Sequence, residues 1–180
     1  MRIAIAALAA TLFTVPLANA QAPAAPAPAA PAPVPEVMPF DIPYGTPINL
    51  ENAQKAIAAA VAEAKKHNWK MAVAVTDPAG NLVAEATMDG TQTASVGIAQ
   101  AKAKTSALFR RATMVLQEAV NGGSPATISL LVNQGAVASG GGFPIVIDGK
   151  LVGAIGASGG IFTQDMVTAK AGLAALGITQ

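Results

Sequence analysis

The stretch that decides the fold runs from Met71 to Thr87 and reads MAVAVTDPAGNLVAEAT. Residues Met71 to Thr76 alternate and are rich in β-forming side chains, and Leu82 to Thr87 has the pattern of a returning strand. The intervening residues are Asp77-Pro78-Ala79-Gly80-Asn81, and such residues favour tight backbone reversals. The stretch therefore predicts an antiparallel β-hairpin.

A second hairpin is predicted towards the C-terminus. Two apolar runs, Pro144 to Ile147 and Leu151 to Ala157, are separated by Asp148-Gly149. An Asp-Gly pair between apolar runs favours a type I′ turn. The triple glycine Gly140 to Gly142 precedes this hairpin and fits either turn geometry or close approach of a ligand.

Helices are predicted around the two hairpins. The expected segments run from Asn49 or Glu51 to about His67, from about Thr93 or Ala94 to Arg111, from around Thr113 to Val120, and from Thr163 or Gln164 to about Leu176. Residues Ala126 to Leu131 fit one more helical turn or a short strand. The order helix, hairpin, helix, hairpin, helix predicts an α/β (α+β) fold, an antiparallel sheet flanked by helices, and not a Rossmann-type array.

The N-terminal residues 1–20 have the features of a cleavable signal peptide. Arg2 gives the positive start, Ile3 to Phe13 is apolar, and Ala18-Asn19-Ala20 is a small-x-small cleavage site. The apolar run is shorter than the roughly twenty residues that span a bilayer. We therefore expect a periplasmic or secreted protein with no stable membrane span after cleavage.

Residues 21–47 are predicted to be a tether and an irregular lead-in, and residues 48–180 a single domain. Apart from Gln21 and Val34, the segment from Gln21 to Pro35 contains only Ala and Pro, and repeated proline favours an extended spacer. The residues up to Pro47 are expected to lie against the domain or a neighbouring subunit.

The amino-acid composition of the chain argues against several classes of function. The chain has no cysteine, so thiolate metal sites and cysteine nucleophiles are excluded. Of the eleven Lys and Arg residues one, Arg2, lies in the signal, which leaves ten basic and ten acidic residues. A near-zero charge with scattered basic residues argues against nucleic acid as a partner.

Few single residues in the sequence point to catalysis or to the binding of a metal or ligand. His67 is the single histidine, and it fits a solvated helix end or a metal or haem-iron ligand. Lys102, Thr105 and Arg111 lie on or near the second helix and fit either exposed helix positions or a binding site. Asp89 and Asp165 have the pattern of ordinary helix-entry acids. We predict no catalytic residues.

Several segments together resemble one family. They are Ala72 to Asp77, Gly80 to Val83, Met88 to Thr91, Ala101 to Thr113, Gly141 to Ile145 with Asp148-Gly149, and Val152 to Gly160 with Gln164-Asp165. This pattern is similar to that of the GlcG/HbpS family, which includes the C-terminal domain of PduO-type proteins. The resemblance covers about Ile48 to Gly177 and implies a profilin-like domain, homo-oligomers and haem binding.

The resemblance also implies where a ligand contacts the chain. Its pocket candidates are Lys102, Thr105, Phe109, Arg111 and Thr113, joined on the loop side by Gly141, Gly142, Ser158 and Gly159. For an iron ligand the sequence offers His67, Met88 and Met114, since His and Met are both accepted axial ligands of haem.

Three hypotheses follow. The first is an exported haem-binding protein, working as a carrier, scavenger or sensor accessory without turnover. The second is an enzyme acting on a small carboxylate, in which Lys102 or Arg111 grips the acid and the Gly156–Gly160 loop holds an oxyanion. The third is an oligomeric accessory domain without a ligand. The expected partners are haem or another small anionic ligand and further copies of the chain.

Overall fold

A computed structural model describes residues 33–179 of the chain. The predicted signal peptide and most of the Ala/Pro tether lie outside these residues. Within the described part, no helix combines the length and the hydropathy that a membrane crossing requires.

Nine elements make up the described domain. In chain order they are α1 (Leu50–Lys66), β1 (Ala72–Thr76), β2 (Leu82–Thr87), α2 (Ala94–Phe109), α3 (Thr113–Asn121), α4 (Pro125–Gln134), β3 (Gly142–Ile147), β4 (Lys150–Ser158) and α5 (Phe162–Ala175). The strands form one sheet in the order β2-β1-β4-β3, and every neighbouring pair is antiparallel. The predicted α+β fold is confirmed.

Both predicted hairpins are present, and side-chain chemistry explains their turns. In the first, the Asp77 carboxylate accepts hydrogen bonds of 2.9 Å from the backbone N–H and the side-chain amide of Asn81. In the second, Asp148 has φ 49° and Gly149 has φ 72°. Two consecutive positive φ angles are what a type I′ turn requires, which confirms the Asp-Gly prediction.

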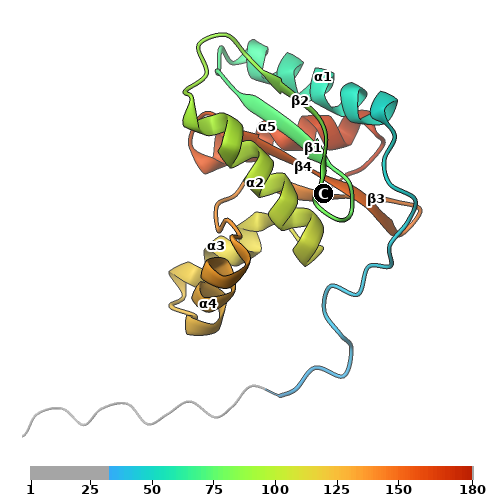
Figure 1. The fold of residues 1–180 in the computed structure, drawn as a ribbon, viewed down its shortest axis with the longest axis vertical. Coiled ribbons are helices and arrows are strands. Elements are labelled where there is room, and N and C mark those ends of the chain that lie inside the picture. The colour runs from blue at the N-terminus through green and yellow to red at the C-terminus, as the bar shows by residue number, and fades with distance from the viewer. Residues whose placement is uncertain (1–32, 180) are drawn as a thin grey trace, which may run out of the picture. The chain divides into compact units, whose positions relative to one another are not determined.

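The two faces of the sheet pack against different helices (Figure 1). Val73, Val75 and Ile155 lie in one core cluster with residues of α1 and α5. Ala72 and Ala74, which alternate with those valines, pack instead against Ala residues of α2. Because side chains along a strand alternate between faces, one short strand serves both layers.

Helix α2 approaches the sheet unusually closely. A Cβ atom on Gly156 of β4 would overlap the carbonyl oxygen of Ala99 and lie 2.5 Å from the backbone nitrogen of Ala103. The helix therefore needs a side-chain-free position on β4, and a small-residue surface of its own, to pack at this distance.

Helices α3 and α4 form a pair that extends beyond the sheet (Figure 1). The undecided residues Ala126 to Leu131 are helical: Ser124 caps α4 by accepting from the Thr127 N–H, and Gly135 ends it with φ 60°. No residue of α4 is buried. Its apolar side chains Ile128, Leu130 and Val132 are exposed.

The lead-in before α1 lies against the domain. The Leu151 N–H donates to the carbonyl of Pro43, and the Gly45 N–H donates to the carbonyl of Leu151, both at 2.8 Å. The Arg110 guanidinium donates to the carbonyl of Ile42 at 2.9 Å. These backbone hydrogen bonds therefore attach the irregular lead-in to the start of β4.

Candidate functional site

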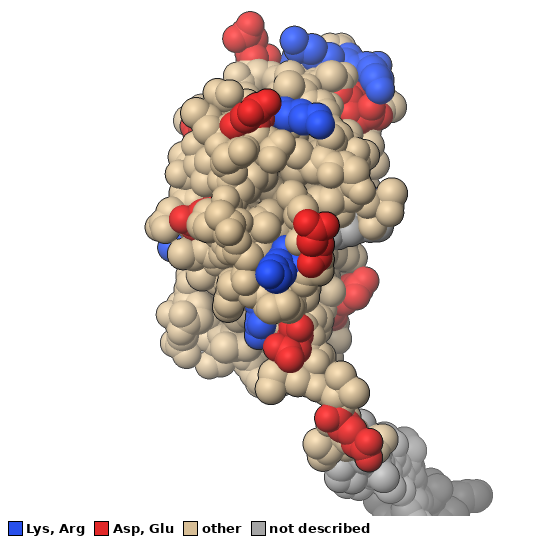
Figure 2. Space-filling model, turned by 90° about the vertical axis from the view of Figure 1, so that its right-hand side faces the viewer, with Lys and Arg blue, Asp and Glu red and all other residues tan. Residues whose placement is uncertain are grey.

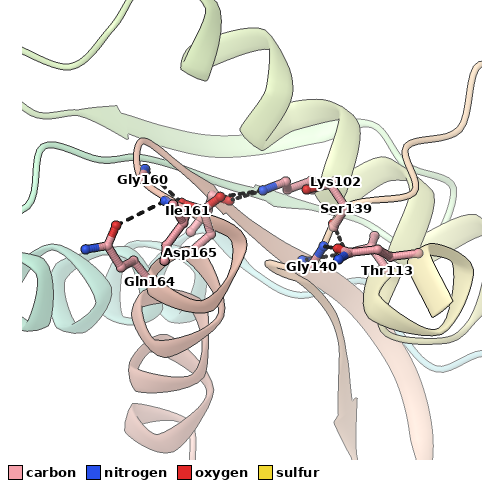
Figure 3. Close-up of polar contacts among 11 residues, drawn as sticks. Lys102, Thr113, Ser139, Gly140, Gly160, Ile161, Gln164 and Asp165 are labelled. Carbon is pink, nitrogen blue, oxygen red and sulfur yellow. Dashed lines mark hydrogen bonds and ion pairs between the residues drawn. The ribbon is translucent and has the colours of Figure 1, made fainter. Parts of the chain in front are cut away.

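A buried ion pair joins α2 to α5. Lys102 Nζ lies 2.6 Å from Asp165 Oδ2, and the two side chains are 2% and 3% exposed. The same ammonium donates to the carbonyl of Ala157 at 3.2 Å. The other carboxylate oxygen of Asp165 accepts from the Gly160 N–H at 3.1 Å. Figure 3 shows Lys102 reaching from α2 towards the start of α5.

This pair corrects two sequence interpretations. Lys102 and Thr105 are not exposed helix positions but are 1% and 2% exposed. Asp165 is not an ordinary helix-entry acid, because its carboxylate is buried against Lys102. The physical reason is the small-residue face of α2, which lies so close to the sheet that the lysine is enclosed.

The surroundings of Asp165 shift the pKa of its carboxyl in two opposite directions. Burial raises the pKa of Asp165 above its ordinary value, although the hydrogen bond and the positive charge of Lys102 act to lower it. An ammonium and a backbone N–H hold this carboxylate in the way that a carboxylate-binding site would. In the structure the carboxylate that Lys102 holds therefore belongs to the chain itself.

A loop before β3 covers the ion pair. Thr113 donates from Oγ1 to the Ser139 carbonyl at 2.6 Å and accepts from the Gly142 N–H at 2.9 Å. Gly141 has φ +118°, and a Cβ there would lie 2.7 Å from the Asp165 Cβ and 3.1 Å from Lys102 Nζ. The structure thus brings together four predicted pocket residues, Lys102, Thr113, Gly141 and Gly142.

Ser158 and Gly159 follow directly on the Ala157 carbonyl that Lys102 contacts. Ser158 is 4% exposed and pairs with Ala72 of β1. A Cβ on Gly159 would overlap the carbonyl of Lys70. These two positions close the end of the sheet, and their role as ligand contacts stays a prediction.

The remaining predicted pocket residues face other neighbours. Thr105 accepts through Oγ1 from the Val137 N–H at 3.0 Å. Arg111 donates from Nε to the Phe109 carbonyl at 3.0 Å, and its guanidinium lies 3.5 Å from the centre of the Phe40 ring. Burial lowers the pKa of Arg111, helped by the nearby charge of Arg110. These contacts tie the end of α2 to the lead-in and to the loop after α4.

The three iron-ligand candidates lie on separate elements. His67 ends α1, with Nε2 3.1 Å from Glu63 Oε1, and its ring stacks on Trp69 at 4.3 Å between centroids. The Met114 sulfur lies beside Gly140 with the sulfur of Met166. Among the described residues no three His, Asp or Glu side chains gather as a metal site.

Met88 lines a hollow of about 340 Å³ between α1 and β2. We call it the Met88 hollow, and its lining residues are Val61, Lys65, Lys70, Ala86, Thr87, Met88 and Asp89. The lining contains two lysines and one aspartate, so its net charge is positive. Sequence reasoning missed both lysines, although they flank His67 and Trp69 closely in the chain.

Two further hollows differ in chemistry. The Tyr44 hollow, of about 440 Å³, is lined by Tyr44, Gly45, Pro47, Asp77, Pro78, Ala79 and Leu108 and includes no cation. The Lys104 hollow, of about 400 Å³, is lined by Thr76, Gly80, Leu82, Gly97, Gln100, Ala101, Lys104 and Gly135. Of the three, the Met88 hollow alone combines cations with a thioether.

On the face shown in Figure 2, acidic and basic side chains are interspersed.

Comparison with known proteins gives a consistent result. Residues 48–174 match the family model described as "Haem degrading protein HbpS-like". Protein GlcG of Escherichia coli K12 is 40% identical over 113 residues, which cover 62% of this chain and 81% of that protein.

Two solved structures have the same fold. HbpS is 31% identical with a TM-score of 0.69, covering 79% of this chain and 99% of that one. A PduOC:heme complex is 29% identical with a TM-score of 0.68, covering 72% of this chain and 95% of that one.

Proposed function

The chain belongs to the HbpS-like family, and from that premise we propose that it is an exported haem-binding protein whose haem enters the Met88 hollow. The observation that carries the proposal is the lining of this hollow, in which two lysines and a thioether share one cavity. Haem carries two propionates and an iron, so a site for it needs apolar walls, cations and, optionally, an iron ligand.

The residues of the hollow fit these needs. Val61 and Ala86 are apolar walls, and Lys65 and Lys70 are ammonium groups for the propionates. Both lysines are exposed, so each ion pair with a propionate contributes modestly. The volume of about 340 Å³ lies at the lower end of ligand pockets, so part of a haem stays outside the hollow or meets another subunit.

Met88 is the proposed iron ligand. Its backbone is fixed, because its N–H donates to the Met71 carbonyl at 3.0 Å and its carbonyl accepts from Thr91 at 3.1 Å. A thioether ligand favours the reduced state of haem iron and raises its potential. His67 lies outside the lining of the hollow, and its Nε2 already faces Glu63.

The proposal includes export, homo-oligomers and binding without turnover. Export is supported by the signal-like residues 1–20; mass spectrometry of secreted protein should find Gln21 as its first residue. Oligomers are supported by the exposed apolar side chains of α4 and by the segment Ala112–Ile147, in which Glu118 is the one charged residue. Light scattering should give a multiple of the chain mass.

Hemin titration followed by Soret absorbance tests the haem proposal. The chain should saturate near one hemin per subunit. Met88→Leu, which keeps the volume but removes the sulfur, should change the spectrum and weaken binding. Replacing both Lys65 and Lys70 with Gln should weaken binding about ten-fold, because two exposed ion pairs each contribute up to about 1 kcal/mol.

The matched controls are Met114→Leu, His67→Gln and Lys55→Gln, none of which alters the Met88 hollow. A spectrum that responds to Met114 or His67 but not to Met88 would place haem elsewhere, and a non-saturable titration would end the haem proposal. With ascorbate and dioxygen, bound hemin should lose its Soret band no faster than free hemin. Faster loss would make the protein a haem-degrading one.

A further inference from the structure

We propose that the Lys104 hollow is a second binding site, separate from the Met88 hollow, for a small organic acid that carries a carboxylate and a further hydrogen-bonding group. The hollow lies on the α2 side of the first hairpin. Thr76, Gly80 and Leu82 form one wall, and Gly97, Gln100 and Lys104 of α2 form the other.

An unpartnered buried hydroxyl points to a ligand here. Thr76 is 1% exposed, and its Oγ1 has no hydrogen-bond partner within the described residues. A buried polar atom without a partner is unfavourable and calls for an explanation. The hydroxyls of Thr91, Ser95 and Thr168 also lack partners in this part of the chain, but none of them lines one of the three hollows.

A glycine inside a helix gives independent support. Gly97 lies four residues into α2, where glycine lowers helix stability relative to alanine. A Cβ at Gly97 would meet nothing within 4 Å, so packing within this domain does not require the glycine. Its effect is to leave the mouth of the Lys104 hollow open.

The charged side chains in and around the Lys104 hollow favour a negatively charged ligand. Lys104 is exposed, and no ion pair or hydrogen bond of its ammonium is seen among residues 33–179. Glu85 of β2 accepts from the Gln100 side-chain amide at 2.5 Å and does not line the hollow. Lys104 is thus the one charged side chain in the lining.

The lining also sets the class of acid. Lys104 suits a carboxylate, and the Thr76 hydroxyl suits a hydroxyl or carbonyl group. The Gln100 side-chain nitrogen donates to Glu85, which leaves its carbonyl oxygen to accept from a ligand hydroxyl. Leu82 and Ala101 provide small apolar contacts. The hollow therefore fits compact hydroxy or oxo acids better than long-chain acids.

The test is a titration of the full chain with lactate, followed by the amide signals of Gly80, Gly97 and Gly135. Lactate should shift these signals saturably in the millimolar range, on the order of the affinity of few-contact ligands. Lactamide, the uncharged analogue, should not. Lys104→Gln should weaken lactate binding about three- to ten-fold, and Gly97→Val should weaken it by filling the hollow.

Lys55→Gln is the matched control, because Lys55 is exposed on α1, and it should leave lactate binding unchanged. Hemin uptake should be the same in Lys104→Gln and in the natural chain, so loss of one site is distinguishable from loss of the other. Equal shifts with lactate and lactamide, or lactate binding unaffected by both Lys104→Gln and Gly97→Val, would overturn the proposal. So would lactate shifts that never saturate.

Discussion

Replacing Lys102 with Met tests whether the buried ion pair stabilises the fold. The change removes the ammonium and keeps an unbranched side chain of similar length. At the 2.6 Å separation, an effective dielectric constant of 20 gives an attraction of about 6 kcal/mol. Desolvation costs several kcal/mol for each ion, so attraction and cost nearly cancel in the intact pair. The variant keeps the cost at Asp165 without the attraction, and its free energy of unfolding should fall by about 3–5 kcal/mol at neutral pH.

The loss should depend on pH, and its sign follows from the Asp165 carboxyl. Burial already raises the pKa of Asp165, and Lys102 supplies the hydrogen bond and charge that oppose the rise. Without Lys102 the folded pKa moves further above the unfolded value, so the folded variant holds the proton more tightly. Its contribution to stability is present at low pH and is lost as pH rises through the folded pKa. The deficit of the variant should therefore shrink on going from neutral to acid pH.

Urea unfolding at pH 7 and pH 5, at a fixed protein concentration, measures both effects. The double variant Lys102→Met/Asp165→Asn should recover about 2 kcal/mol of the loss, since residues in contact couple strongly. Lys104→Met is the matched control and should stay within about 0.5 kcal/mol of the natural chain. A Lys102 variant no less stable than this control, or a deficit that grows at pH 5, would refute the reasoning.

Three further substitutions test the packing around the site. Gly156→Ala should destabilise the domain in urea by about 3 kcal/mol or more, because its Cβ would overlap α2 at Ala99. Gly97→Ala should raise the free energy of unfolding by about 0.5–1 kcal/mol, measured in the same way without ligand. Thr113→Val should lower stability by about 1–3 kcal/mol and speed amide hydrogen exchange at Gly142, which loses its acceptor.

The element pattern was predictable because it depends on neighbours in the chain. The two hairpins follow from turn residues between apolar strands, and the positive φ angles of Asp148 and Gly149 bear out the chemistry of that pair. Residues Ala126 to Leu131 were ambiguous because a short apolar run fits a helix or a strand. Ser124 and Pro125 ahead of the run are the helix-start signals that decide it.

The buried ion pair was not predictable in the same way, since Lys102 and Asp165 lie 63 residues apart. A partial signal was present: Lys102 lies three residues after Ala99 and four before Ser106, both buried, a spacing that places all three near one helix face. The lining of the Met88 hollow depends likewise on how α1 meets β2, and no pattern within either segment encodes that contact.

Lys102 and Lys104 of α2 have different roles because α2 lies so close to the sheet. We expect Lys102 to contribute to the stability of the fold and Lys104 to ligand binding. Lys102 and Lys104 are two residues apart, which is about 200° of rotation on a helix. Lys102 is therefore enclosed against the Ala157 carbonyl of β4 and requires Asp165 as a partner, whereas Lys104 remains exposed at the rim of its hollow. Removing the first charge should lower stability and removing the second should lower lactate affinity. If both substitutions lowered both properties alike, the ion pair and the Lys104 hollow would be parts of one site.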